Sequence, residues 1–91
     1  MKKGQNIIGQ QVRSKRMSLG LSQNKLAMKC QLKGWQLSRE TLSKIESGLR
    51  CVTDAEAFFL ADILECTVDA LMKAPLSDIL FAMRHSRDRD S

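Results

Sequence analysis

The chain has 91 residues, of which 43% are hydrophobic and only 4% aromatic. That length suffices for one compact domain and leaves little room for a second core. Cys30, Cys51 and Cys66 are odd in number and far apart, which argues against a disulfide framework or a zinc site. No signal-peptide pattern or membrane-length apolar run is present. We therefore expect a single-domain cytoplasmic protein without a metal, a cofactor, a small-molecule ligand or a membrane contact.

The charge is divided unevenly along the sequence. Residues 1–50 hold 11 basic and two acidic residues, a net charge of +9, whereas residues 51–91 hold four basic and eight acidic residues, a net charge of −4. A polyanion such as nucleic acid would be attracted to the first half of the chain. Charge alone leaves a second interpretation open, in which the basic residues only form a solvated surface.

The pattern of apolar residues predicts an all-helical domain, because no alternating run is long enough for a strand. A first helix is expected from Ile8, with Ile8, Val12 and Leu19 on one stripe and Met17 alongside, ending at Gly20.

Four further helix starts carry a capping residue. Ser22 opens a second helix whose apolar positions are Leu26, Ala27, Cys30 and Leu32, and Ser38 opens a third that runs to about Ser47. Thr53 and Glu56 form a capping box for a fourth helix with Phe58, Leu60, Ala61 and Leu64, and Thr67 caps a short fifth. These starts predict four helices after the first.

Pro75 interrupts the pattern before a last apolar stripe, formed by Leu76, Ile79, Leu80 and Met83. We expect this stripe to pack on its own domain, with packing between two copies as the alternative. Residues from His85 to Ser91 predict a frayed tail, so His85 is not expected to bind metal or catalyse a reaction.

Two short capped helices joined by a turn are the outline of a helix-turn-helix unit. The chain resembles the phage repressor and Cro-like (Xre-type) helix-turn-helix family over residues 7–72. The segments that carry this resemblance are VRSKRMSLGLSQ (12–23), KLA (25–27), SRETLSKIESG (38–48), LA (60–61) and VDALM (68–72). The resemblance implies a five-helix lambda-repressor-like domain at 7–73, followed by a short extra helix and flexible tail at 74–91.

By this resemblance the third helix reads base edges in the major groove of double-stranded DNA, often as part of a homodimer. The expected base-reading residues are Arg39, Glu40, Ser43 and Lys44. The expected contacts to the DNA backbone come from Ser22, Gln23, Lys25, Lys33, Ser38 and Arg50. The resemblance also implies a structural ion pair between Arg16 and Glu46. A repressor associated with the nucleoid would follow, with no enzymatic activity.

The connection at residues 31–37 is about five residues longer than the tight turn of that family. It is expected either to lengthen the second helix by about one turn or to form a loop, with Lys33 near a phosphate and Trp35 against the core rather than stacked on a base. The rival interpretation of the whole chain is a protein-interaction or antitoxin-like module that keeps the fold.

Overall fold

The computed structural model describes residues 4–85, with only the backbone of His85 included. Within this range the chain forms helices and no strand, which confirms the predicted fold class. The helices are α1 (Gly9–Ser18), α2 (Gln23–Leu32), α3 (Arg39–Glu46), α4 (Asp54–Ile63), α5 (Val68–Leu71) and α6 (Leu76–His85). His85 ends α6 and does not begin a tail, and the rest of the predicted tail lies outside the described residues.

The helix starts follow the capping residues that the sequence predicts. The side chains of Ser22, Ser38, Thr53 and Thr67 each accept a hydrogen bond from the backbone N–H three residues further on. Glu56 completes the capping box by accepting from the backbone N–H of Thr53 at 3.1 Å. Such local bonds satisfy donors that a helix leaves unpaired, so four short helices begin where the sequence requires.

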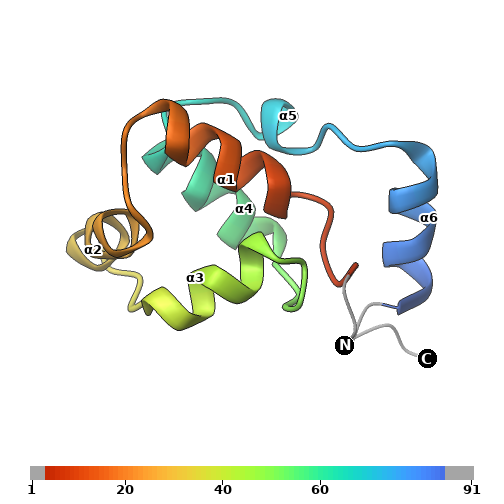
Figure 1. Ribbon diagram of the computed structural model, residues 1–91, viewed down its shortest axis with the longest axis horizontal. Coiled ribbons are helices and arrows are strands. Elements are labelled where there is room, and N and C mark those ends of the chain that lie inside the picture. Colours follow the sequence, from red (N-terminus) through yellow and green to blue (C-terminus); the bar gives the residue numbers. More distant parts are fainter. Residues whose placement is uncertain (1–3, 86–91) are drawn as a thin grey trace.

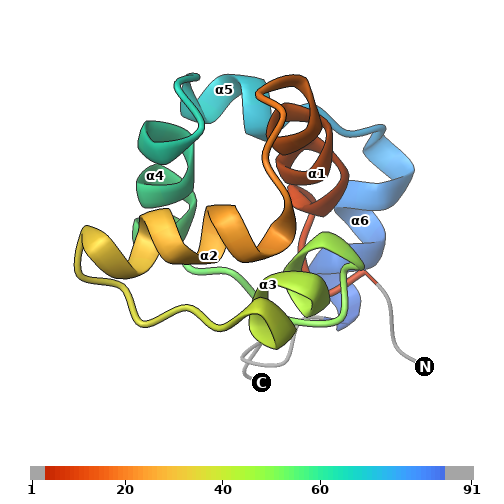
Figure 2. The ribbon, with the colours of Figure 1, turned by 60° about the vertical axis from the view of Figure 1, so that its left-hand side comes forward.

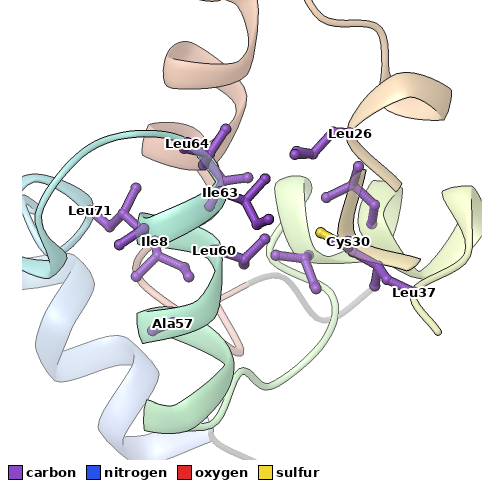
Figure 3. Close-up of a cluster of buried hydrophobic side chains, with 13 residues drawn as sticks. Ile8, Leu26, Cys30, Leu37, Ala57, Leu60, Ile63, Leu64 and Leu71 are labelled. Atoms are coloured by element: carbon purple, nitrogen blue, oxygen red, sulfur yellow. The ribbon is translucent and has the colours of Figure 1, made fainter. Parts of the chain in front are cut away.

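The core lies between α1 to α5 and is formed by aliphatic side chains with one cysteine. Figure 1 shows these five helices gathered together and α6 set apart beyond the N-terminal segment. Figure 3 shows the inward-pointing side chains, which include Ile8, Leu26, Cys30, Leu37, Ala57, Leu60, Ile63, Leu64 and Leu71. Burial also raises the pKa of the Cys30 thiol to about 11, so Cys30 stays protonated and acts as a core residue.

Several apolar residues predicted to face the core are exposed instead. Met17 and Leu19 lie outside because Arg16, a neighbour on α1, occupies the inward position. Leu32 is 83% exposed because it lies about 200° around α2 from the buried Cys30. On α4 the inward residue is Phe59 and not Phe58, since Phe59 packs edge-on against Trp35 with ring centroids 5.5 Å apart.

The self-packing expected of α6 is only partial. Ile79, Ala82 and Met83 line a groove shared with the N-terminal segment, although Met83 is still 62% exposed, and Leu76 and Leu80 are exposed outside this groove. No helix within residues 4–85 has the length and apolar character needed to cross a membrane.

The N-terminal segment ties the start of α1 to the end of α3 through Asn6. The Asn6 side-chain oxygen accepts from the backbone N–H groups of Ile8 and Gly9 at 3.0 and 2.8 Å. Its amide nitrogen donates to the carbonyls of Ile45 and Arg50 at 3.1 and 2.8 Å. All the hydrogen-bonding capacity expected of one amide is therefore used between segments about 40 residues apart.

Gly9 permits α1 to approach the end of α3 at backbone distance. A Cβ atom at this position would lie 2.4 Å from the carbonyl oxygen of Ile45 and 2.9 Å from that of Glu46. Neither carbonyl can move without disturbing the last turn of α3, so the close approach requires the absence of a side chain.

We expect Gly9→Ala to destabilise the domain by about 1–3 kcal/mol, because the added methyl group meets backbone atoms. Urea unfolding followed by circular dichroism measures the change. Gln10→Ala is the matched control, since Gln10 is exposed on the same helix and its replacement should change stability by less than about 0.5 kcal/mol. Equal stability of the two variants would contradict the close approach.

Candidate nucleic-acid interface

The four residues predicted to read bases share one side of α3. Arg39, Glu40 and Lys44 are exposed and Ser43 is half-buried, all within about 140° of the helix circumference. Leu42 and Ile45 are buried on the side that faces the core, and Glu46 is buried two turns beyond Arg39, at the edge of the exposed side. The first two turns of α3 therefore present donors and acceptors to solvent from a helix whose back is fixed in the core.

The ion pair implied by the resemblance is present and buried. Arg16 Nε donates to Glu46 Oε2 at 2.7 Å, and a terminal guanidinium nitrogen of Arg16 donates to Glu46 Oε1 at 3.1 Å. The other terminal nitrogen donates to the carbonyl of Leu21 at 2.7 Å. Only 10% of the arginine side chain and 4% of the glutamate side chain is exposed. The pair joins α1, the α1–α2 turn and the end of α3.

Gln23 connects this buried pair to the exposed side of α3. Its amide nitrogen donates to Glu46 Oε1 at 3.0 Å, and its carbonyl oxygen accepts from Arg39 at 3.5 Å. Both ends of the Gln23 amide are thus used within the protein. Arg39, the first residue of α3, is oriented by a chain of contacts that begins at Arg16.

The N-termini of α2 and α3 lie on the side of the molecule where the contacts that begin at Arg16 end, at Gln23 and Arg39. Figure 2 shows α2 passing above the start of α3, with the connecting loop below α2. Ser22 and Ser38 cap the two helices, and Ser38 Oγ also donates to Thr41 Oγ1 at 3.0 Å. Backbone N–H groups at such termini bind phosphate oxygens, and Lys25 is exposed in the first turn of α2.

The remaining two residues predicted to contact the DNA backbone are Arg50 and Lys33, and they are placed differently. The guanidinium of Arg50 holds both carboxylate oxygens of Glu56, at 3.0 and 3.2 Å, and also donates to the carbonyl of Cys51. Burial raises the pKa of Glu56, but hydrogen bonds from Arg50 and the Thr53 N–H outweigh it and leave the pKa below its ordinary value. The stabilisation from this pair is present at neutral pH and is lost as the pH falls through the lowered pKa.

The long connection both extends α2 and forms a loop. Helix α2 continues to Leu32, and Gly34, with φ +109°, turns the chain away from it. Trp35 then packs on Phe59 and Leu37 is buried, as expected for anchors rather than base-stacking residues. The Gln31 side chain donates to the carbonyl of Leu37 at 2.8 Å. The loop is held against α2 by this bond and by its buried side chains.

Lys33 is exposed, but it lies on the other side of α2 from this loop. Gln31 marks the loop side, and Lys33 follows about 200° further round the helix. The phosphate contact from Lys33 therefore stays a prediction. Sequence reasoning also missed the connection from Gln23 to both Glu46 and Arg39, because a glutamine at a helix start carries no local signal for its distant partners.

No group of three or more His, Cys, Asp or Glu side chains suited to a metal ion occurs in the described part of the chain. The exposed side chains around α3 offer hydrogen bonds and charge. Their arrangement suits recognition of a charged polymer through the exposed side of α3.

The helix-turn-helix family model matches residues 12–71, which is well over half of the chain. This region spans α1 to α5 together with the ion pair and the exposed side of α3. The protein therefore belongs to the Cro-like (Xre-type) helix-turn-helix family of DNA-binding domains. No match was found among curated proteins or among solved structures.

Replacing Arg16 by Met should destabilise the domain by about 3–5 kcal/mol, because it leaves the Glu46 carboxylate buried without its cation. The double variant Arg16→Met/Glu46→Met should recover most of this loss, since no uncompensated charge remains. Equilibrium denaturation of the two variants provides the comparison.

The control is Arg13→Met, which removes an exposed arginine from the same helix and should have little effect. If Arg16→Met were no more harmful than Arg13→Met, the ion pair would not be a major support of α3.

Proposed function

We propose that this protein is a transcriptional repressor that binds a specific double-stranded DNA sequence, with α3 in the major groove. The observation that supports this most directly is the exposed side of α3, whose first residue is oriented through Gln23 and Glu46. A helix held in this way can present the same side chains to every binding site. The cytoplasm, at the nucleoid, is the location proposed for this activity.

The chemistry of the four α3 residues suits direct base reading. Arg39 and Lys44 can donate to the O6 and N7 atoms of guanine, and Glu40 can accept from the N4 amino group of cytosine. Ser43 lies between them and can either donate or accept. We assign the sequence preference to these residues, with Arg39 as the principal contributor because it stands at the start of α3, where its guanidinium contacts the Gln23 carbonyl oxygen at 3.5 Å.

We assign the DNA backbone contacts to Ser22, Lys25 and Ser38, together with the first backbone N–H groups of α2, which include that of Gln23. These residues set affinity and register but carry little sequence information. Arg50 is left out because its guanidinium already holds Glu56. We propose no catalytic step, since the acidic residues in the basic half are Glu40 on α3 and Glu46 in the buried ion pair.

Arg39→Ala should lower affinity for the preferred duplex while leaving binding to unrelated duplexes almost unchanged, a loss of about 1–3 kcal/mol in discrimination. Lys25→Ala should weaken binding to all sequences alike and reduce the slope of log affinity against log salt by about one. Fluorescence anisotropy over a salt series, with a site selected from random duplex DNA, measures both quantities.

Lys73→Ala provides the control, because Lys73 is exposed in the connection between α5 and α6 and is not among the residues assigned to the DNA contact. This variant should bind like the parent chain. If the parent chain showed no salt-sensitive binding to any duplex, the protein-interaction or antitoxin-like interpretation would replace the repressor.

We further propose that the DNA-bound form is a two-fold homodimer. The exposed residues Leu76, Leu80 and Met83 follow one stripe of α6, and each is apolar. A symmetric contact through this stripe would bury it in both copies at once.

DNA sites selected by the parent chain should then contain two half-sites about one helical turn apart. Leu80→Asp should reduce binding to the paired site by more than tenfold while leaving weak binding to one half-site unchanged, because a carboxylate would be buried in the contact. Ser77→Asp, at an exposed position one side of the stripe, is the matched control. Recovery of single, unpaired sites would contradict the dimer.

A further inference from the structure

The outer side of α2 carries apolar and basic residues that the proposed DNA contact does not use. Met28 and Leu32, one turn apart, are 54% and 83% exposed, and Lys29 and Lys33 are exposed beside them. Neither lysine has a hydrogen-bond or ion-pair partner within the described part of the chain. We call Met28, Lys29, Leu32 and Lys33 the α2 outer face.

The two lysines of this face are turned away from the loop that leads to α3. The loop leading to α3 runs along the Gln31 side of α2, where the Gln31 amide bonds to the Leu37 carbonyl. Lys29 and Lys33 lie two residues before and after Gln31, about 160–200° away around the helix. DNA lying on the start of α3 would therefore leave both lysines free for another contact.

The outer side of α4 has the opposite charge around an exposed aromatic ring. Phe58 is 68% exposed, and Asp62 follows one turn later on the same side of the helix. Glu65, just beyond the end of α4, is also exposed near this side, and neither carboxylate has a partner among residues 4–84. We call Phe58, Asp62 and Glu65 the α4 outer face.

The two outer faces complement each other in both apolar character and charge. One offers two flexible aliphatic side chains beside two ammonium groups, and the other offers a ring beside two carboxylates. They cannot meet within one molecule, because Leu26 and Leu60, on the inward sides of α2 and α4, are both buried in the same core. The complementary surface is therefore available only on a second copy.

We propose that the α2 outer face of one copy binds the α4 outer face of the next in a head-to-tail contact. Phe58 would enter between Met28 and Leu32, whose positions on α2 are about 6 Å apart along the axis. The flexible stems of Lys29 and Lys33 allow their ammonium groups to reach Asp62 and Glu65. The ring supplies the buried apolar area and the charges fix which faces pair.

A head-to-tail contact leaves one α2 outer face and one α4 outer face free at the ends, so further copies can add. It differs in this respect from the symmetric contact proposed for α6. Together the two contacts would let neighbouring dimers on DNA touch each other, which gives cooperative occupation of adjacent sites. The head-to-tail contact itself does not depend on DNA.

Charge reversal in two complementary variants tests the contact in the absence of DNA. The first variant, Lys29→Glu/Lys33→Glu, makes both outer faces acidic, and the second, Asp62→Lys/Glu65→Lys, makes both basic. Their combination in one chain exchanges the charges and keeps the net charge of the parent, so it is the matched control. All four side chains in question are exposed, and thermal unfolding checks that each variant remains folded.

All variants carry Leu80→Asp, which removes the contact through the α6 stripe. The chain whose two outer faces are unchanged should then self-associate at low salt, and its association should weaken as salt is added. Sedimentation equilibrium measures this association. Each single-face variant should bind itself at least about tenfold more weakly. An equimolar mixture of the two variants, and the combined variant, should regain association within about threefold of the parental outer faces.

Phe58→Ser should weaken association by a similar factor without changing its salt dependence, because it removes the apolar part alone. The proposal is overturned if no association is detected up to about 1 mM protein, because a specific complex with a lower Kd would have formed at that concentration. It is also overturned if the single-face variants associate like the parent, which would assign the contact to another surface, or if their mixture fails to associate. In those cases the exposed ring of Phe58 would serve a different partner.

Discussion

The buried ion pair between Arg16 and Glu46 is the interaction on which the position of α3 depends. Placing two charges in a low-dielectric interior carries a large desolvation cost, which is offset only when geometry and hydrogen bonding are nearly complete. Here Glu46 accepts three hydrogen bonds, two from Arg16 and one from Gln23, and Arg16 places its remaining nitrogen on the Leu21 carbonyl. A small displacement of α3 would break several of these bonds together, so the helix has one well-defined position.

The other polar contacts and the close backbone contact of α3 are made at its two ends. At its C-terminal end, Asn6 binds the Ile45 carbonyl and Gly9 allows α1 to approach the backbone, while at its N-terminal end Ser38 caps the helix. Arg39 meets Gln23 beside that cap. The helix is thus held before any ligand arrives. If such a helix binds DNA, its fixed position reduces the conformational entropy lost on binding, because few side chains and backbone segments still have to be ordered at the interface.

The surface follows the uneven charge of the chain. Lys25 lies in the first turn of α2 and Arg39 in that of α3, whereas exposed acidic residues such as Asp62 and Glu65 lie on or just beyond α4. This separation favours one orientation of the domain towards a polyanion. It also leaves the apolar residues Met28, Leu32 and Phe58 outside the proposed DNA contact, next to charges of opposite sign on the two helices. The proposed DNA contact and the proposed contact between copies therefore use different parts of one small fold.

By itself the sequence determined where the helices begin, because a capping bond such as that from Thr41 to Ser38 joins residues only three apart and depends on nothing else. Resemblance to the family added the Arg16–Glu46 pair. The tertiary structure decided which side of each helix is inward: Arg16 displaced Met17, and Phe59 rather than Phe58 met Trp35. It also decided the roles of Asn6, Gln23 and Arg50, whose partners include Ile45, Glu46 and Glu56. Such contacts join separate elements, so their geometry exists only once the core has packed and no local pattern in the chain encodes it.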